Sequence, residues 1–146
     1  LLPLAGKDGT APAGGDGELR RGSGSVLVVD DEEYVRDFAC RLLKRIGYEV
    51  TACASGEEAI GYYRENPAGT DVVLLDLIMP RVGGADVFRA LKRIDPDVKV
   101  ILASGYSRNE VVDALLRDGA AGFLRKPFRI TELSAQVAAA AESHTD

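Results

Sequence analysis

The chain has 146 residues, 46% of them hydrophobic and 28% charged, which suits one globular domain with a proper core and not two. No apolar run approaches the roughly 20 residues of a membrane helix, and no signal-peptide pattern is found, so we expect no membrane contact. The formal net charge is -5, and Lys and Arg are scattered singly or in pairs, which argues against nucleic acid as a direct ligand.

Residues 1–24 are rich in glycine and show no helical or strand period. We interpret them as a flexible linker that precedes a folded domain over residues 25–146. Within that domain the two cysteines, Cys40 and Cys53, have apolar neighbours and no CxxC spacing. Two thiols cannot form a disulfide framework, so we expect small buried side chains and a cytoplasmic location.

From Ser25 onward, short apolar runs alternate with amphipathic stripes. The runs predict strands at 26–29, 48–53, 71–76, 98–103 and 120–124. Helical spacing of apolar residues predicts helices at 34–46, 55–66, 87–94, 111–116 and 130–141. Ser55 with Glu58 three residues later indicates a capping box, and Gly47 and Gly119 are helix stops.

Strands that alternate with helices predict an α/β fold with a doubly wound parallel sheet and helices on both faces. Right-handed crossovers leave few topologies, and at this size the five-stranded flavodoxin-like order 2-1-3-4-5 is the natural one. In such sheets the functional site lies beyond the carboxyl ends of the strands.

Acidic, hydroxyl and amine groups follow those strand ends. The first strand ends in Asp30 and Asp31, the third in Asp76, the fourth in Ser104, and the fifth runs into Lys126. The predicted strand order makes these four strands neighbours. We therefore expect the three carboxylates to converge, with the hydroxyl and the ammonium group beside them.

Crowded carboxylates repel one another unless a cation lies among them, and an all-oxygen cluster without His or Cys suits Mg²⁺. A cation, a nucleophilic carboxylate, an ammonium group and a hydroxyl together favour phosphoryl transfer. Each residue alone has a plainer interpretation. The aspartates and Ser104 could cap helices or begin turns, and Lys126 could be a solvated charge. Their convergence at adjacent strand ends is harder to explain in that way.

Four segments of the chain resemble the response regulator receiver domain of two-component signalling systems. They are VLVVDDEE at 26–33, DVVLLDLIMPRVGG at 71–84, VILASGYS at 100–107 and GFLRKPF at 122–128. The resemblance runs from about Ser25 to the end of the chain. It implies a domain that takes a phosphoryl group from a phosphohistidine, in a Mg²⁺-dependent reaction, and then changes conformation.

The resemblance also implies a role for each matching residue. Asp76 would be the phosphoacceptor, and Asp31, Asp76 and the main-chain carbonyl of Ile78 would hold Mg²⁺, with Asp30 acting through water. Ser104 would hydrogen-bond the phosphoryl group and Lys126 would pair with it. The remaining implied features are the aromatic switch residue Phe123, a cis peptide before Pro127, and the loop residues Pro80 and Gly84.

Side chains two residues past the acceptor and past the hydroxyl, Ile78 and Tyr106, are expected to flank the path of a hydrolytic water and so to tune the lifetime of the phosphorylated state. The departures from the family pattern are modest. Ser104 replaces the commoner Thr, Arg81 brings a charge to the pocket rim, and Phe123 has no hydroxyl.

Three other interpretations agree less well with these residues. A haloacid-dehalogenase-like phosphatase needs a second acid two residues after its nucleophile, and here that residue is Ile78. A flavodoxin-like cofactor binder needs a phosphate loop after its first strand, where Asp30 and Asp31 would repel phosphate. A degenerate receiver that only docks partners would lack the acceptor or the lysine, whereas Asp76 and Lys126 are both present.

The expected partner is a histidine kinase or a histidine phosphotransfer domain, since His144 lies in a polar tail and is a poor phosphotransfer histidine. A downstream protein would bind the face formed by the fourth helix, the fifth strand and the fifth helix. We expect no output domain in this chain after its last helix. The segments ASGYS and GAAGFLRKPF are most like the C-terminal receiver of a hybrid histidine kinase, and residues 1–5 resemble the end of a kinase ATP-binding domain. A stand-alone regulator is the alternative.

Overall fold

The computed structural model describes residues 22–142. Its strands are β1 (Ser25–Val29), β2 (Glu49–Cys53), β3 (Val72–Asp76), β4 (Val100–Ser104) and β5 (Gly122–Arg125). Its helices are α1 (Glu33–Ile46), α2 (Gly56–Glu65), the short 3-10 helix η2 (Pro67–Gly69), α3 (Gly84–Ile94), α4 (Glu110–Arg117) and α5 (Ile130–Glu142).

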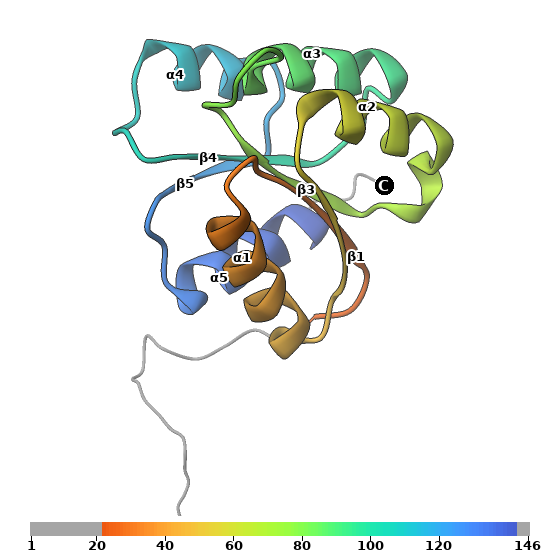
Figure 1. Cartoon of the computed structure of the whole chain (residues 1–146), viewed down its shortest axis with the longest axis vertical. Helices are drawn as coiled ribbons and strands as arrows, with labels where there is room; N and C mark the ends of the chain where they lie inside the picture. The colour runs from red at the N-terminus through yellow and green to blue at the C-terminus, as the bar shows by residue number, and fades with distance from the viewer. Residues whose placement is uncertain (1–21, 143–146) are drawn as a thin grey trace, which may run out of the picture.

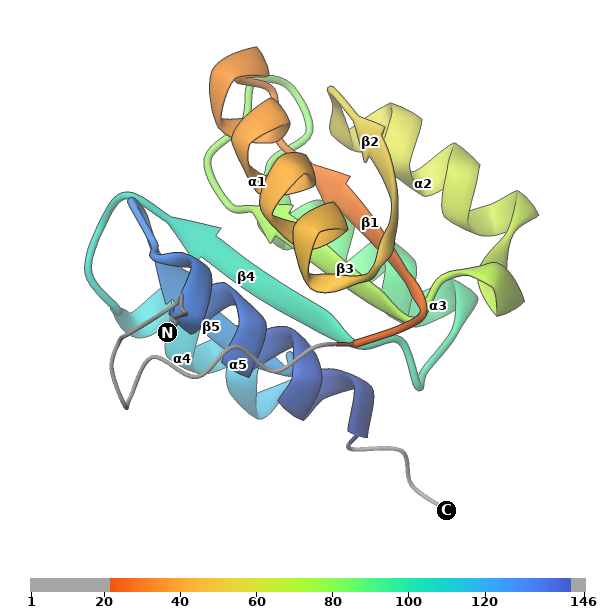
Figure 2. The same cartoon turned by 90° about the horizontal axis from the view of Figure 1, so that it is seen from below.

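The five strands form one parallel sheet in the order β2-β1-β3-β4-β5. Helices α1 and α5 cover one face of the sheet, and α2, α3 and α4 cover the other (Figure 1). Seen from below, α1 and α5 lie side by side across the strands (Figure 2). The predicted α/β fold, its strand order and its helices on both faces are therefore confirmed.

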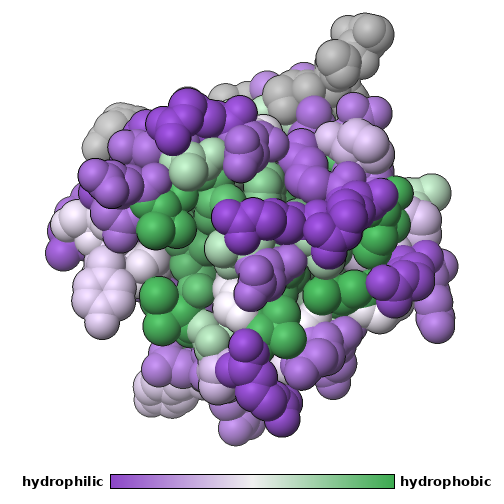
Figure 3. Space-filling view, turned by 90° about the horizontal axis from the view of Figure 1, so that it is seen from above, coloured by the Kyte–Doolittle hydropathy of each residue, from purple (hydrophilic) through white to green (hydrophobic). Residues whose placement is uncertain are grey.

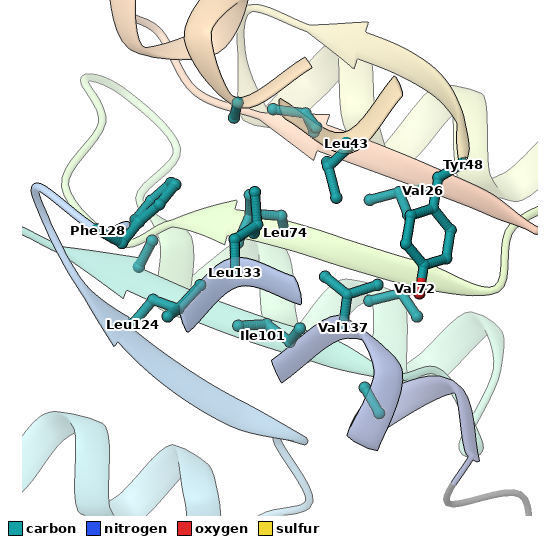
Figure 4. Packing of buried hydrophobic residues seen from close by; sticks show 14 of the residues in the cluster. Val26, Leu43, Tyr48, Val72, Leu74, Ile101, Leu124, Phe128, Leu133 and Val137 are labelled. Atoms are coloured by element: carbon teal, nitrogen blue, oxygen red, sulfur yellow. The ribbon is translucent and has the colours of Figure 1, made fainter. Parts of the chain in front are cut away.

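Alternating side chains of the strands feed two separate hydrophobic cores. Val26 and Val28 of β1 point to the side of α1 and α5, whereas Leu27 and Val29 pack against the opposite helices. Figure 4 shows the first core, in which Leu133 of α5 faces the sheet. This burial on both faces explains why the central strands appear as uninterrupted apolar runs.

Four strands begin later than the sequence predicts, β2 and β3 by one residue and β4 and β5 by two, although the elements themselves are those expected. Before β4, the Asp95 carboxylate accepts the Asp97 main-chain N–H at 3.0 Å and Val98 N donates to Asp95 O, so a turn occupies the expected first residue. Before β5, Ala120 N donates to Leu115 O of α4, so its start is held by the preceding helix.

Local signals also fix the helix ends. The Ser55 hydroxyl accepts the Glu58 main-chain N–H at 3.1 Å, and the Glu58 carboxylate accepts the Ala54 N–H at 2.7 Å, which confirms the expected cap of α2. Helix α1 is followed directly by Gly47, which ends it with a φ of 120°, in the region that favours glycine.

Most of the predicted linker, residues 1–24, lies outside the described residues, as do His144 and the expected remnant at 1–5. Its last residues do make contacts with the domain: Gly22 N donates to Ile46 O and Gly24 O accepts from Glu49 N. Among residues 22–142, no helix is long and apolar enough to span a membrane.

The cysteines differ in burial. Cys53 is buried, and burial raises the pKa of its thiol to about 11. Cys40 is half-buried, and its pKa is also raised, mainly by burial. Both therefore behave chiefly as small core or near-core side chains rather than as reactive thiolates.

Gly84 marks a close approach between the start of α3 and the end of β3. An added Cβ would lie 2.5 Å from Leu77 Cα and 2.6 Å from Asp76 O, both main-chain atoms. Gly84 N also donates to Leu77 O at 3.0 Å. The loop between β3 and α3 can therefore close in this form only when residue 84 has no side chain.

Gly84→Ala should lower the free energy of unfolding by about 1–3 kcal/mol, because a methyl group there forces main-chain atoms apart. Gly61→Ala is the matched control, since Gly61 lies inside α2 and an added Cβ meets nothing within 4 Å. That variant should be more stable by about 0.5–1 kcal/mol. Urea unfolding followed by circular dichroism measures both changes. Equal stability of the two variants would show that the close approach imposes no constraint.

Candidate functional site

The carboxyl ends of four neighbouring strands meet at one edge of the sheet. Asp30 directly follows β1, Asp76 is the last residue of β3, and Ser104 is the last residue of β4. All three residues are only 4% exposed. The parallel register pairs Asp76 with Ala103 and Ser104 with Arg125, so the polar groups lie in one row across this edge.

Three carboxylates gather at this edge, as the strand order predicts. One ligand oxygen from each of Asp30, Asp31 and Asp76 lies within 4.8 Å of the other two. Asp30 and Asp76 are buried, whereas Asp31 is exposed. Such a set of hard oxygen donors is what a small divalent cation prefers.

Lys126 bridges the two buried carboxylates. Its Nζ lies 2.8 Å from Asp30 Oδ2 and 3.1 Å from Asp76 Oδ1, and its side chain is 16% exposed. Burial works to lower the pKa of Lys126, but the hydrogen bonds and charges of Asp30 and Asp76 outweigh burial and raise it. The ammonium group is therefore held in its charged form between the two acids.

One ammonium group does not neutralise this pocket. Burial and the nearby charge of Asp30 raise the pKa of Asp76 to about 6, although Lys126 and the main-chain N–H of Ile78 both favour the carboxylate. The Ile78 N–H donates to Asp76 Oδ1 at 3.3 Å. The residual negative charge and the shape of the donor set both fit a divalent cation at this position.

The hydroxyl and the loop residues surround the acids. Ser104 Oγ accepts the Tyr106 main-chain N–H at 3.0 Å, and Ser104 O accepts from Lys126 N at 2.8 Å. Ile78 and Tyr106 lie on the rim, 60% and 66% exposed. Phe123 on β5 is half-buried against the core beneath α3 and α4.

The peptide bond between Lys126 and Pro127 is cis, the geometry that the resemblance implies. In the loop after β3, Arg81 has a φ of 66°, an uncommon conformation for a residue other than glycine. Its guanidinium lies 3.7 Å from the Glu57 carboxylate of α2, and both side chains are largely exposed. The charge at position 81 thus faces α2.

Two features of this edge are absent from the motifs. Arg36 of α1 donates from Nη1 to the main-chain carbonyl of Asp30 at 2.9 Å. A groove of about 710 Å³ also opens beside Lys126. An arginine at the end of the first turn of the helix after an acidic pair is a weak signal. The groove is indicated in the sequence only by the aromatic residues Tyr34 and Phe38 near the start of that helix.

The groove is lined by both apolar and charged side chains. Tyr34 is 90% exposed and Phe38 47% exposed, which is unusual for aromatic side chains on a helix of a small domain. The rings of Phe38 and Phe128 lie 6.5 Å apart between centroids, tilted by 34°. The remaining lining residues are Glu32, Val35, Asp37, Arg41, Gly105, Lys126 and Pro127.

The face covered by α2, α3 and α4 shows both apolar and hydrophilic side chains. Figure 3 views the side covered by α2, α3 and α4, where apolar side chains lie between hydrophilic ones. Partly buried residues that pack against the core there include Tyr62, Met79, Val82 and Leu116.

Lys126→Met should lower the free energy of unfolding by about 2–3 kcal/mol in chelator, because it leaves two buried carboxylates without their cation. Adding Asp76→Asn to that variant should restore part of the loss, since one of the unpaired charges is then gone. Lys44→Met on the exposed side of α1 is the control and should change stability by less than about 0.5 kcal/mol. Urea unfolding measures all three variants. The prediction is wrong if Lys126→Met and Lys44→Met are equally stable.

Similarity to known proteins extends over most of the chain. The family model described as "Response regulator receiver domain" matches residues 26–138. Sensor kinase CckA of Brucella abortus is 39% identical over 116 residues, which cover 80% of this chain and 12% of that protein. Chemotaxis protein CheY of Thermotoga maritima is 34% identical over 105 residues, which cover 71% of this chain and 86% of that protein.

Solved structures share the fold. A response regulator receiver domain protein from Clostridium thermocellum gives a TM-score of 0.79 at 32% identity, covering 82% of this chain and 95% of that one. The CheX-CheY-BeF3-Mg²⁺ complex from Borrelia burgdorferi gives 0.75 at 27% identity, covering 78% of this chain and 86% of that one. The family model covers most of the chain, and the strand order and the acidic edge agree with it, so this chain belongs to the response regulator receiver domain family.

Proposed function

We propose that this chain is a phosphoacceptor signalling domain, in which Asp76 takes a phosphoryl group from a phosphohistidine in a Mg²⁺-dependent reaction. The observation that carries the proposal is the position of Asp76: buried at the end of β3, 3.1 Å from Lys126 and grouped with two further carboxylates. Membership of the receiver family supports it, since taking up a phosphoryl group is the general function of that family.

Asp76 supplies the nucleophile. Its carboxylate oxygen forms the bond to phosphorus while the phosphorus–nitrogen bond of the phosphohistidine breaks, and the bonding electron pair stays on the imidazole nitrogen. Asp31, Asp76 and the main-chain carbonyl of Ile78 would hold Mg²⁺, with Asp30 acting through water. Bound Mg²⁺ would supply positive charge to the crowded carboxylates and to the phosphoryl oxygens.

Lys126 and Ser104 act on the phosphoryl oxygens once the group is attached. The Lys126 ammonium already lies between Asp30 and Asp76, so it can shift to a phosphoryl oxygen with little movement of its main chain. The Ser104 hydroxyl accepts a hydrogen bond from Tyr106 N, which leaves its own proton for a phosphoryl oxygen. Both residues stabilise the charge that develops as the group is transferred.

The donor is proposed to be a histidine kinase or a histidine phosphotransfer domain. Its histidine has to reach the exposed rim of the acid pocket, where the groove between α1 and the segment around Lys126 begins. The parent protein is proposed to be a hybrid histidine kinase with this domain in the cytoplasm, by likeness to CckA, of which the chain spans 12%. A stand-alone regulator is the alternative, since the chain spans most of CheY.

Incubation with acetyl phosphate should add the mass of one phosphoryl group to the wild-type protein when Mg²⁺ is present and none when it is chelated. Asp76→Asn should abolish the gain, because the amide cannot act as the nucleophile. Asp86→Asn, an exposed aspartate at the start of α3, is the control and should label like wild type. Intact-protein mass spectrometry gives the answer directly.

Two results would contradict this assignment. Equal labelling in chelator would remove the metal from the reaction, and labelling that survives Asp76→Asn would place the phosphoryl group elsewhere. A wild-type protein that never labels, with any donor, would favour the docking module that works without phosphorylation.

Phosphorylation of Asp76 is further proposed to draw Ser104 inward and to let Phe123 fill the space it leaves, which alters the surface of α4 and β5. A downstream protein would then recognise the face of α4, β5 and α5. Both residues have room to respond, because the hydroxyl is held by a single described N–H and the Phe123 ring is only half-buried. The shift follows from contacts that the phosphoryl group makes in one state and not in the other.

Amide spectra recorded with beryllofluoride and Mg²⁺ should therefore change throughout residues 104–124. Mg²⁺ alone should affect mainly the residues around the three carboxylates, and this titration separates metal binding from the switch. The Asp76→Asn variant is the control and should show no response to beryllofluoride. Changes confined to the acid pocket would count against the switch.

The lifetime of the phosphorylated state is proposed to depend on Ile78 and Tyr106, which lie on the rim of the pocket. Hydrolysis needs a water in line with phosphorus, opposite the Asp76 oxygen. Ile78 has no polar atom in its side chain with which to orient such a water. Tyr106 is bulky enough to shield the same path.

Ile78→Asn should shorten the lifetime by about tenfold, since an amide that orients a water needs to lower the barrier by only ~1.4 kcal/mol. Decay of the phosphorylated protein after donor removal is the measurement. Val111→Asn is the matched control, because Val111 is an exposed aliphatic residue on α4. If both variants decay at the wild-type rate, water access at residue 78 does not set the lifetime.

A further inference from the structure

Arg36 is the basic side chain of α1 that reaches the acid pocket, and the motifs give it no role there. Its Nη1 donates to the main-chain carbonyl of Asp30 at 2.9 Å, and the residue is half-buried. That carbonyl belongs to the peptide group that joins Asp30 to Asp31. The contact therefore acts on the main chain between two residues of the carboxylate cluster.

The rest of this loop is held by other hydrogen bonds. Asp30 N donates to Cys53 O at 3.2 Å, which ties the loop to β2, and Glu32 N donates to Asp30 Oδ1 at 2.9 Å. Arg36 N donates to Glu32 O at 2.9 Å, which joins the loop to α1. These contacts fix the side chain of Asp30 and the two ends of the loop. None of these hydrogen bonds is made to the peptide group between Asp30 and Asp31.

The position of this peptide group sets the position of the Asp31 Cα, from which the carboxylate extends. Asp31 is the exposed member of the cluster, so core packing does not hold its side chain as it holds the other two. A planar guanidinium that is itself half-buried is a stiff donor, because fewer of its rotamers stay open than for an exposed side chain. The Asp30 carbonyl is thus held from α1, and the Asp31 Cα, which belongs to the same peptide group, is held with it.

We propose that Arg36 is a positioning residue that orients the Asp30–Asp31 peptide, and through it the Asp31 carboxylate, for binding a divalent cation. The inference rests on the proposed function, which makes this cluster the Mg²⁺ site. Residues that orient metal ligands without touching the metal are typically worth about 10–100-fold in affinity. A single hydrogen bond to a carbonyl belongs at the lower end, so the loss expected here is about tenfold.

Charge and position have opposite effects on affinity, which makes the inference testable. The positive charge of Arg36 repels a cation, so removal of that charge alone would tighten Mg²⁺ binding. Loss of the hydrogen bond frees the peptide and weakens binding. Arg36→Lys keeps the charge but loses the planar donor, and Arg36→Met loses both.

The experiment titrates Mg²⁺ into wild type, Arg36→Lys and Arg36→Met, and follows amide shifts of the residues around the pocket. Lys44→Met is the matched control, since it removes one positive charge from the exposed side of the same helix. Hydrogen exchange of the Glu32 amide in metal-free protein is the second readout, because this N–H depends on the position of Asp30. Thermal unfolding checks that each variant is folded.

Arg36→Lys should bind Mg²⁺ about tenfold more weakly than wild type, and Arg36→Met should also bind more weakly but by a smaller factor, because loss of its charge offsets part of the effect. Both variants should exchange the Glu32 amide faster, while Lys44→Met matches wild type in both readouts. Tighter binding by Arg36→Met together with wild-type affinity in Arg36→Lys would overturn the inference in favour of charge alone. Unchanged affinity in both variants overturns it too and leaves the proposed function intact. If wild type binds no Mg²⁺, the proposed function loses its metal, and a Glu32 exchange rate that stays unchanged then refutes the anchoring role of Arg36.

Discussion

Parallel strands of one sheet all finish at the same edge, and polar groups placed after them are forced together whatever their charges. In this domain the constraint brings Asp30 and Asp76, both buried, to within reach of one lysine. The fold keeps the acids together in spite of their mutual repulsion, because the strands that carry them also form the centre of both hydrophobic cores. The core thus holds in place a cluster that would separate if its members were free in water.

Such a cluster is responsive because its charges are nearly but not fully balanced. Lys126 pairs with two carboxylates, and the pKa of Asp76 is still raised to about 6 by burial and by Asp30. A cation or a phosphoryl group that enters the pocket changes this balance. The neighbouring groups can then find new partners, because the ammonium and the Ser104 hydroxyl lie on adjacent strand ends. The phosphoacceptor role proposed for Asp76 would need this sensitivity as much as it needs the nucleophile.

The sequence was sufficient to predict the strand order and the convergence of the acids, because both follow from periodicity and from the residues at the strand ends. Strand starts were less predictable: the turn before β4 depends on how the Asp95 side chain accepts the Asp97 N–H. The motifs could not predict the contact of Arg36 with the Asp30 carbonyl, because it depends on how α1 is rotated about its axis and on one side-chain rotamer. The same holds for the groove, which needs Phe38 and Phe128 to approach from segments far apart in the chain.

The two cores described above lie on opposite sides of a sheet that is one strand thick, and side chains of neighbouring positions in a strand belong to different cores. Packing on the side of α1 and α5 can therefore be altered with little effect on the side of α2, α3 and α4, as expected for sites that share no contacts. Over evolution, the two sides of such a domain can accumulate substitutions at separate rates. Substitutions that reshape the side of α1 and α5 can thus accumulate without disturbing the side of α2, α3 and α4, and the acidic edge between the two sides stays common to both.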